Sequence, residues 1–579
     1  ISRCTNAALE VATGEFVAFL DCDDVLAPNA LYEVVKKLNE NRNLDFIYSD
    51  EDKIDDEGKN RHMPHFKSDW APDTLMAHMY TCHFAVYRRS IAVAIGGIRP
   101  GYEGAQDYDF TLRFTERTDK IAHISKILYH WRERAESTAG TPEAKPYILE
   151  AAKKSKEDAL KRRGLKGELE LIDGIYQYRV NYLCDEYPKV SVIIPSKDNY
   201  DILLQCIKSL CEITDYDNYE IVLVDNGSNE DNKQRYEKLA KQYNIQYIYE
   251  QRAFNFSYMC NLGARHADGE YLLFLNDDIE IIEPQWLKRM VGQASLKHVG
   301  AVGAKLLYPD RDTIQHVGVI NIATGPVHAL SGYSDEPIYY FGKNRMDCNQ
   351  IAVTAACLLV NREKFDDIAG FNEDLAVAYN DIDLCFKLIE KGYYNVVRND
   401  AILIHHESVS RGNDLENNKK FKRLMDEQEK LYKLHPQFKG KDPFYNVNLT
   451  QDKADFSCND IKVLQTSNRK VKKWKHNIKG EPGINIAIDC VHYDKAAYIK
   501  GWFYWKNVLR TNFARMYLAL KNEYQQTFYF EVSRMIRKDV AEALGNGAYN
   551  AGFECRIPYE CLRLNAEAYQ IGVVVEIPW

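Results

Sequence analysis

The chain has 579 residues, which allows three or four domains of about 150 residues each. Apolar residues make up 45% of it and charged residues 27%, a composition that is typical of folded globular proteins and excludes wholesale disorder. The formal net charge is −9, so we expect no nucleic-acid partner, because a nucleic-acid-binding surface needs clustered positive charge.

Membrane-spanning and disulfide-rich classes are not expected either. No apolar run approaches the roughly 18 residues of a membrane span, and runs such as 190–195 and 351–360 have the length of core strands. The 14 cysteines are scattered singly, which is typical of a reducing compartment. We therefore expect a cytoplasmic protein. The basic segment 468–480 is interpreted as a solvated linker, with peripheral contact at the inner face of the cell membrane as the alternative.

An internal repeat organises the first three quarters of the chain. Three blocks recur in the same order at offsets of 255, 274 and 275 residues. The matching blocks are 6–23 with 261–278, 106–109 with 380–383, and 128–131 with 403–406. This order predicts two copies of one domain, with an insertion of about twenty residues in the second copy.

The two copies differ in completeness. Only the second has an apolar strand at 190–194, a helical pattern at 202–210 and a second strand at 219–224 before the repeated blocks begin. Strand, helix and strand in this order predict a βαβ unit of a parallel sheet in an α/β fold. We therefore predict a partial domain over 1–163 and a complete domain over 188–445.

The remaining segments are assigned by composition. Residues 164–187 and 446–483 are predicted linkers. Residues 484–579 contain short alternating runs rich in β-branched and aromatic residues, which predict a small β-sandwich-like accessory domain. Its aromatic residues Trp502, Tyr504 and Trp505 could stack on sugar rings, although alternating aromatics in a strand are more often core residues.

Acidic turns follow two of the predicted buried strands. Asp21-Cys22-Asp23 follows the run 16–20, and Asn276-Asp277-Asp278 follows the run 271–275. Ligands bind at the carboxyl ends of strands in α/β sheets, and carboxylate oxygens there suit Mg²⁺ or Mn²⁺. A turn that only ends the strand is the alternative, but recurrence of the same pattern favours a metal site.

A carboxylate pair opens a predicted helix in each copy. We expect the second acid of each pair, Asp109 and Asp383, to cap the helix. The first acid, Asp107 or Asp381, is then expected to project into the cleft, where a general base would lie.

One histidine recurs behind these acidic motifs. His130 and His405 each end an apolar strand at matching positions of the repeat. A lone histidine is usually structural. Because these two recur behind the acidic turns, we interpret each as a further candidate metal ligand.

Together these residues resemble the inverting glycosyltransferases of family 2, which have the GT-A nucleotide-sugar-binding fold. The resemblance covers roughly 1–131, without the front half of the domain, and 188–411. The motifs that carry it are Val192-Ile193-Ile194-Pro195, Val224-Asp225-Asn226-Gly227-Ser228, Phe254-Asn255-Phe256-Ser257 and His405-His406-Glu407-Ser408. The chain looks like bacterial enzymes that build cell-surface polysaccharide.

The resemblance implies a role for each matching residue. The residues implied to hold the donor nucleotide are Pro195, Ser196, Asp198, Asp225, Asn226, Asn276 and Asp277. The implied metal ligands are Asp278 and His405 in the second copy and Asp21, Asp23 and His130 in the first, and the implied bases are Asp381 and Asp107. Asn276 departs from the family pattern, in which an aspartate is commoner.

The implied reaction moves a sugar from a UDP- or dTDP-sugar to a growing polysaccharide or lipid-linked oligosaccharide with inversion. It uses Mn²⁺ or Mg²⁺ and Asp381 as the base. A non-catalytic glycan-binding or assembly scaffold remains the alternative. A sugar nucleotidyltransferase is a distant third, because 195–199 lacks the glycine of a phosphate-binding loop. The first copy, which has no nucleotide-binding strands here, is expected to be a fragment or a scaffold.

Overall fold

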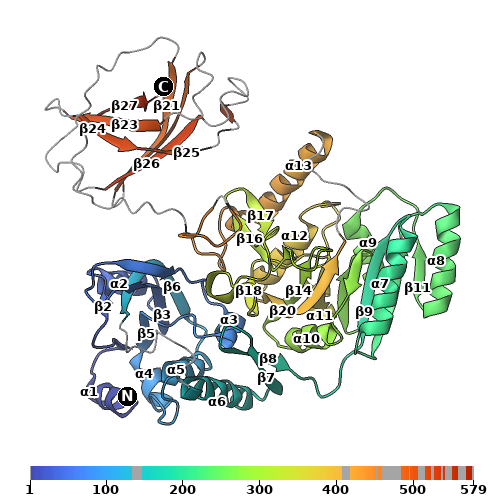
Figure 1. Ribbon diagram of the computed structural model, residues 1–579, viewed down its shortest axis with the longest axis horizontal. Coiled ribbons are helices and arrows are strands. Elements are labelled where there is room, and N and C mark those ends of the chain that lie inside the picture. The colour runs from blue at the N-terminus through green and yellow to red at the C-terminus, as the bar shows by residue number, and fades with distance from the viewer. Residues whose placement is uncertain are drawn as a thin grey trace. The chain divides into compact units, whose positions relative to one another are not determined.

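The computed structural model describes residues 2–133, 146–406, 418–451 and 453–458, together with the strands of the segment 484–576 and a few residues near them. The chain divides into two compact units, Ile1–Ile461 and Lys462–Trp579 (Figure 1). Both copies of the repeat lie in the first unit. The basic segment 468–480 and residues Glu407 and Ser408 lie outside the described residues.

A ten-stranded mixed sheet forms the centre of the second domain. Its main path runs in the order β11 (Gln246–Tyr249), β10 (Tyr219–Asp225), β9 (Val190–Ser196), β12 (Tyr271–Leu275), β19 (Cys357–Asn361), β14 (Val299–Leu307), β20 (Tyr394–His405) and β13 (Ile279–Ile281). Two further strands, β15 (Ile314–His316) and β18 (Cys348–Gln350), pair with β14 and β20. The first four strands of the path are parallel, so the predicted βαβ unit is present.

Helices flank this sheet (Figure 1). They are α7 (Tyr200–Ile213), α8 (Glu230–Tyr243), α9 (Phe256–His266), α10 (Trp286–Ala294), α11 (Arg362–Asp367), α12 (Asn380–Glu390) and α13 (Asn418–Leu434), with short 3₁₀ turns η2 (Tyr340–Gly342) and η3 (Pro436–Phe438). Strands β9, β10 and β12 are apolar and almost fully buried, as strands covered on both faces must be. A small hairpin, β16 (Val319–Ile322) with β17 (Gly325–His328), lies outside the sheet.

The first domain repeats the part of this sheet that runs from β12 to β13. Its strands follow the order β1 (Phe16–Ala18), β5 (Ala85–Arg88), β3 (Phe46–Ile54), β6 (Ile121–Arg132) and β2 (Val25–Leu26), with β4 (Arg61–His65) beside β3. This order and its strand directions match β12, β19, β14, β20 and β13 with β15. The tandem repeat predicted from the sequence is therefore confirmed, and the strands of the second sheet without a counterpart are β9 to β11 and β18.

The helices of the first domain complete the match. They are α1 (Ser2–Val11), α2 (Ala30–Glu40), α3 (Pro72–Ala77), α4 (Arg89–Ala94), α5 (Gln106–Thr115) and α6 (Pro146–Arg163). In α1, the Asn6 amide exchanges two hydrogen bonds with the backbone of Ile98, at 2.7 and 2.8 Å. In α9, Asn261 exchanges the same two bonds with Phe371, at 2.9 and 3.0 Å.

A glycine precedes each of these bonded residues. Gly97 has a φ of +65° and Gly370 a φ of +63°, a left-handed conformation that favours glycine. A Cβ atom would lie 2.5 Å from the Asn6 side-chain oxygen at position 97 and 2.8 Å from that of Asn261 at position 370. Glycine is therefore required at both positions for two reasons, the backbone conformation and the close approach of the asparagine.

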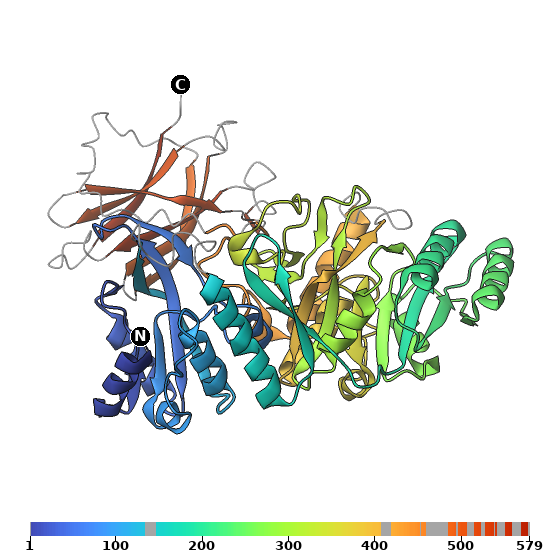
Figure 2. The same ribbon diagram turned by 60° about the horizontal axis from the view of Figure 1, so that its bottom comes forward.

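The segment predicted as a linker between the domains is a β-hairpin. Strands β7 (Gly167–Ile172) and β8 (Gln177–Tyr182) pair antiparallel, and the hairpin and α6, drawn in teal, lie between the two domains in Figure 2. Arg179 of β8 donates a hydrogen bond of 3.1 Å to Asp347 of the second domain. The connection is thus anchored by a buried ion pair and is not an extended linker.

The first unit also extends past the predicted boundary at residue 445. Asn446 donates hydrogen bonds of 3.0 and 3.1 Å to the two carboxylate oxygens of Asp50, a fully buried residue of the first domain. Leu449 and Phe456 are buried in a hydrophobic cluster with strand residues of the second domain. Residues 446–458 therefore belong to the first unit and connect its two domains.

The second unit contains two antiparallel sheets. One has the order β21 (Ile484–Tyr493), β22 (Ala496–Trp505), β26 (Gly552–Pro558), β25 (Ser533–Met535), and the other β24 (Thr527–Glu531), β23 (Arg515–Asn522), β27 (Tyr569–Glu576). Residues of both sheets, including Phe503, Leu518 and Phe553, share one hydrophobic core, as predicted for a sandwich-like domain. Trp502 is half-buried, which fits a packing role, and the side chains of Tyr504 and Trp505 lie outside the described residues.

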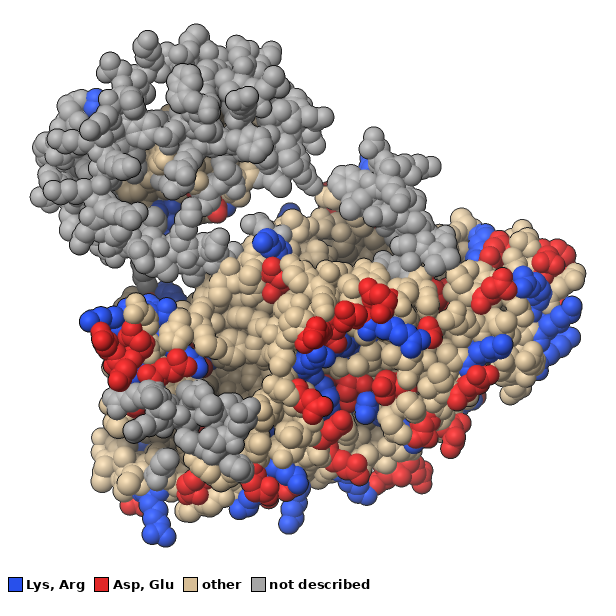
Figure 3. Space-filling view, in the orientation of Figure 1, with Lys and Arg blue, Asp and Glu red and all other residues tan. Residues whose placement is uncertain are grey.

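The described helices include no segment that is both long and apolar enough to cross a bilayer. On the face drawn in Figure 3, Lys and Arg side chains are interspersed with Asp and Glu over the described surface.

We predict that Gly263→Leu destabilises the first unit by about 1–3 kcal/mol. A Cβ atom at position 263 of α9 would lie 2.4 Å from the Ile193 side chain of β9, so a larger residue must displace the strand. The matched control is Ala8→Leu, at the equivalent position of α1, where the side chain is exposed. The thermal unfolding temperature should fall clearly for Gly263→Leu and not for Ala8→Leu. An equal fall in both variants would contradict this packing.

Candidate functional site

The candidate nucleotide-binding residues lie where the parallel strands end. Strands β9, β10 and β12 end in register, so their carboxyl ends form one edge of the sheet. The Ser196 hydroxyl donates a hydrogen bond of 2.6 Å to Asp277, in the turn after β12, and the Asn226 amide of the β10 turn donates one of 2.9 Å to the Ser196 carbonyl. The structure thus brings Ser196, Asn226 and Asp277 together, as the sequence predicts.

Asp277 connects two strand ends. Burial raises the pKa of its carboxyl group to about 6; hydrogen bonds from Ser196 and Asn199 oppose the rise, and the neighbouring Asp278 carboxylate adds to it. This pKa lies above the ordinary value of an aspartate. Because the Asp277 carboxylate accepts a hydrogen bond from the Ser196 hydroxyl, it connects the end of β12 to the end of β9.

Asp225 is held entirely by protein groups on both of its oxygens. Its Oδ1 accepts hydrogen bonds from the Ser228 amide at 2.8 Å and the Ser228 hydroxyl at 2.7 Å. Its Oδ2 accepts one of 2.6 Å from the Tyr247 hydroxyl of β11, and the residue is fully buried. Asp225 therefore shapes the turn around Gly227. Tyr247 was not identified from the sequence, because a tyrosine in a predicted edge strand carries no functional signal.

Asp198 is directed toward the start of α8. Its Oδ1 accepts from the Asn229 amide at 2.8 Å and from the Asn229 and Asn232 side chains at 2.7 and 3.2 Å. Pro195, half-buried in β9, lies opposite Val224 of β10 in the parallel register. Both residues therefore flank the same sheet edge as Ser196.

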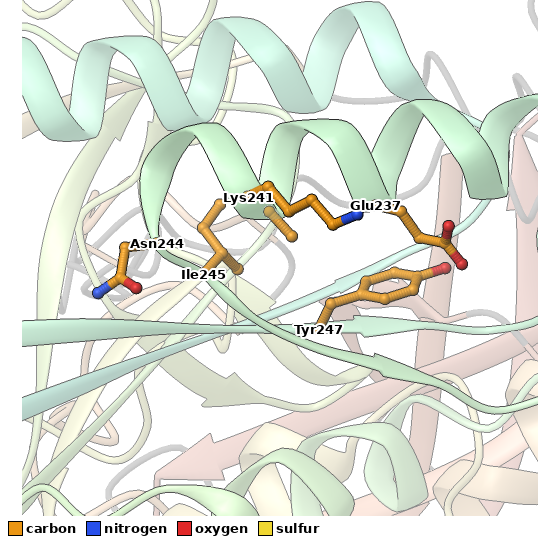
Figure 4. A pocket seen from close by; sticks show the side chains of 6 residues that line it. Glu237, Lys241, Asn244, Ile245 and Tyr247 are labelled. Carbon is orange, nitrogen blue, oxygen red and sulfur yellow. The ribbon is translucent and has the colours of Figure 1, made fainter.

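A hollow of about 430 Å³ lies between α8 and β11. Its lining residues, most of them labelled in Figure 4, are Glu237, Ala240, Lys241, Asn244, Ile245 and Tyr247. Tyr247 connects the hollow to Asp225 through its hydroxyl group. The candidate metal ligands and the candidate base do not line it.

The second acidic turn meets the recurring histidine. Ile279 of β13 lies opposite His405 of β20, so Asp278, one residue earlier, lies beside the imidazole. His405 Nε2 is 3.1 Å from Asp278 Oδ1 and 3.5 Å from the Asn276 amide nitrogen. Among the described residues, neither Asp278 Oδ1 nor His405 Nδ1, both buried, has a hydrogen-bond partner.

These atoms suit a divalent cation in part. The site offers a buried carboxylate oxygen without a hydrogen bond and a neighbouring imidazole nitrogen. Both atoms can bind a divalent cation, and the carboxylate oxygen is the kind of ligand that suits Mn²⁺ and Mg²⁺. The described part of the chain contains no group of three or more His, Cys, Asp or Glu side chains arranged around one such position. A cation here would therefore take its other ligands from outside these side-chain types.

The candidate base is tied to this pair through one loop. Asp381 opens α12, and its Oδ2 accepts a hydrogen bond of 3.1 Å from the Ala355 amide. The backbone N–H of Asn276 donates a hydrogen bond of 3.0 Å to the carbonyl oxygen of the next residue, Ala356. The loop before β19 therefore connects the base to the turn that carries Asp278.

Asp383 does not cap α12 as predicted. The helix begins at Asn380, so Asp383 lies one turn into it, fully buried. Its carboxylate pairs with Lys387 at 2.8 Å and with His435 at 3.0 Å. Asp109 in α5 pairs in the same way with Arg113, at 2.9 Å. Both residues are ion-pair partners inside the helix, and the capping prediction was wrong.

The first domain places its candidate metal ligands differently. His130 Nδ1 lies 2.5 Å from Asp52 of the neighbouring strand β3, and Arg61 pairs with the other oxygen of Asp52. The Asp21 side chain is exposed and Asp23 is half-buried. Val25 lies opposite His130, one residue beyond the position that corresponds to Ile279, so the strand register is shifted by one residue from that of the second domain. An acidic residue on β3 pairs with the imidazole, and the structure does not join His130 to Asp23.

The candidate base of the first domain also differs. The segment before β5 corresponds to the loop before β19, because β5 pairs with β1 as β19 pairs with β12. The His83 amide donates a hydrogen bond of 2.9 Å to Glu51 and not to Asp107. Burial raises the pKa of Asp107 above its ordinary value. Asp107 therefore lacks the contact that Asp381 receives from Ala355.

The fold and these contacts define a class: mixed α/β domains with an acidic turn and a helix-borne carboxylate at one sheet edge, as in nucleotide-sugar-dependent transferases. The sequence pattern described as glycosyl transferase family 2 matches residues 2–96 and 191–369. The two matched stretches, one in each domain, belong to that family, which confirms the resemblance seen in the sequence.

Curated relatives from bacteria match long stretches of the chain. A protein of Sinorhizobium fredii named "Uncharacterized protein y4gI" is 40% identical over 466 residues, 79% of this chain and 51% of the relative. The "O-antigen biosynthesis protein RfbC" of Myxococcus xanthus is 38% identical over 418 residues, 71% of this chain and 32% of the relative. A "Chondroitin synthase" of Pasteurella multocida is 27% identical over 134 residues, 22% of this chain and 13% of the relative. The chain thus spans about half of the first relative and about a third of the second.

We predict that Tyr247→Phe lowers the free energy of unfolding by about 1–3 kcal/mol, because it leaves Asp225 Oδ2 buried without its 2.6 Å donor. Tyr243→Phe, on the adjacent helix α8, is the control and should change stability by less than about 0.5 kcal/mol. Denaturant unfolding followed by circular dichroism measures both. A Tyr247→Phe protein as stable as the control would show that the Asp225 contact contributes nothing.

Proposed function

We propose that the second domain transfers a sugar from a nucleotide-diphosphate sugar to a hydroxyl group of a growing glycan. The observation that carries this proposal is the loop 353–356, which links Asp381 to the turn holding Asp278 beside His405. A base, an oxyanion-binding position and a nucleotide-binding sheet edge are the parts that such a transfer needs.

The reaction proposed is a single displacement with inversion. The acceptor oxygen forms a bond to the anomeric carbon while the bond from that carbon to the diphosphate oxygen breaks. Asp381 accepts the proton of the acceptor hydroxyl, and the nucleoside diphosphate leaves with the bonding electrons. Hydrogen bonds from Ala355 and Ile382 hold the Asp381 carboxylate in one orientation before the acceptor arrives, at 3.1 and 2.9 Å.

Asp278 and His405, with the Asn276 amide beside them, are the residues proposed to hold Mn²⁺ or Mg²⁺. The cation would supply positive charge that stabilises the leaving diphosphate. Ser196, Asp277 and Asn226 are proposed to bind the nucleotide directly. Asp198, whose Oδ1 accepts three protein hydrogen bonds, and Asp225, whose two oxygens both accept from protein donors, are proposed to shape its site, with Pro195 at its edge.

The donor and acceptor classes are proposals as well. A UDP- or dTDP-sugar donor and a polysaccharide or lipid-linked acceptor follow from the family resemblance, and the name of the Myxococcus relative supports an envelope polysaccharide. We place the reaction in the cytoplasm, with peripheral contact at the inner face of the cell membrane as the alternative. A chain that binds no nucleotide sugar would favour the alternative of a glycan-binding scaffold.

We predict that Asp381→Asn lowers the turnover of sugar transfer by about 10²- to 10⁴-fold and leaves donor binding intact, because the amide cannot accept the acceptor proton. Nucleotide release from UDP- and dTDP-sugars measures turnover, and calorimetry measures donor binding. Asp107→Asn, at the matching position of the first domain, locates the activity. Equal losses in both variants would contradict placement of the base in the second domain.

We predict that Asp278→Asn and His405→Ala each weaken Mn²⁺ binding by at least about tenfold, because each removes one donor atom from the proposed site. Electron paramagnetic resonance of free Mn²⁺ measures this binding without a turnover assay. Glu280→Gln is the control, since Glu280 on β13 pairs with His406 and Arg311 at 2.9 and 2.8 Å. Unchanged Mn²⁺ affinity in both ligand variants would rule out this cation site.

A further inference from the structure

Helix α13 contacts the segment that precedes α12, the helix that carries the candidate base. Glu427 of α13 is buried, and its Oε2 accepts a hydrogen bond of 2.7 Å from the Ala378 amide. The neighbouring Gln428 donates to the Tyr379 hydroxyl at 3.2 Å and to the Thr324 carbonyl at 3.0 Å. Two consecutive residues of α13 thus hold the two residues just before Asn380, where α12 begins.

The segment they hold has an uncommon backbone conformation. Tyr379 has a φ of 59° and a ψ of 8°, in the left-handed region that costs free energy for a residue with a bulky side chain. Such a conformation persists only where the surroundings fix it, and it occurs preferentially at functional sites. It sets the direction in which α12 starts, and Asp381 lies two residues further on.

Helix α13 is fixed to α12 at its other end as well. His435, directly after α13, lies 3.0 Å from Asp383 and 2.6 Å from Glu390, both on α12. Burial works against protonation of His435, but hydrogen bonds to these two carboxylates raise its pKa. The two helices are therefore joined near both ends, and Glu427 contacts the end nearer to Asp381.

The first domain has a corresponding connection made from different residues. Helix α6 follows strand β6 as α13 follows β20. Its Asp158 accepts hydrogen bonds from Tyr102 and from Arg99, in the segment that leads into α5 and Asp107. An acidic residue of the later helix thus contacts the approach to the carboxylate-bearing helix in both copies. The left-handed residue occurs only in the second, since its counterpart Ala105 has a φ of −141°.

We infer that Glu427 is a positioning residue for Asp381: as an acceptor for the Ala378 amide, it fixes the start of α12 so that the Asp381 carboxylate faces the acceptor hydroxyl. This inference rests on the proposed role of Asp381 as the base. A small displacement of a positioned catalytic group lowers the rate much more than it lowers binding. The requirement is for an acceptor atom, so the negative charge of Glu427 is dispensable.

The test compares Glu427→Leu, which removes the acceptor, with Glu427→Gln, which keeps an acceptor oxygen and removes the charge. We expect Glu427→Leu to lower kcat of sugar transfer by about 10- to 100-fold with an unchanged donor Kd. Glu427→Gln should retain kcat within about threefold of the native protein. The control is Glu429→Leu, on the exposed face of α13, where Glu429 forms an ion pair of 2.9 Å with Lys433.

Rescue of kcat in Glu427→Gln, with an unchanged donor Kd in both variants, separates positioning from a general loss of structure. If Glu427→Leu fails to fold, Gln428→Leu removes the hydrogen bonds to the Tyr379 hydroxyl and the Thr324 carbonyl, keeps the Glu427 contact, and should lower kcat by about three- to tenfold at unchanged Kd.

Three results would overturn the inference: native kcat in a folded Glu427→Leu protein, equal losses of kcat in the Gln and Leu variants, or native kcat in Gln428→Leu where Glu427→Leu does not fold. Failure of the proposed function is distinguishable from these. An active Asp381→Asn protein would refute the base itself, whereas an inactive Asp381→Asn protein beside a fully active Glu427→Leu protein would refute only the positioning role.

Discussion

The antiparallel pairing of β13 with β20 is the constraint on which the candidate site depends. It sets Ile279 opposite His405, and the His406 amide donates a hydrogen bond of 3.0 Å to the Asp278 carbonyl. The acidic turn therefore cannot leave the imidazole without breaking the sheet edge. The equivalent strands β2 and β6 also pair antiparallel in the first domain, but with the register shifted by one residue, and His130 contacts Asp52 there. Register brings the elements together, and the side chains on neighbouring strands decide which contacts form.

Much of the fold could be predicted because local sequence patterns indicate both the repeat and the strands. Constant offsets identify two copies, and apolar runs that stop at Pro195 or at the Asp225 turn mark strand ends at one edge. The contacts that orient the site leave no such pattern. The donor to Asp381 is the backbone amide of Ala355, and any residue could supply it. The Tyr247 contact to Asp225 depends on how β10 and β11 pair, which sequence spacing does not specify.

Domain boundaries were harder to predict for a related reason. The contact between Asn446 and Asp50 joins residues 396 positions apart, and polar contacts of this kind have no hydrophobic periodicity. The hairpin β7–β8 is short and charged, so its composition is that of a linker, although Arg179 makes it part of the packed unit. Misassignment of Asp383 has the same origin, since its partner His435 lies 52 residues away.

The order of strands in the second sheet also bears on synthesis of the chain. Strand β12 ends at Leu275, and its antiparallel neighbour β19 begins only at Cys357. At translation rates of about 5–20 residues per second, one edge of β12 stays unpaired for roughly 4–16 seconds before β19 is synthesised. The earlier domain already contains β5, which pairs with β1 in the same antiparallel way. Tandem copies of one topology thus expose the nascent chain to cross-pairing between β12 and β5, and early closure of the β1–β5 pair keeps that competing edge occupied.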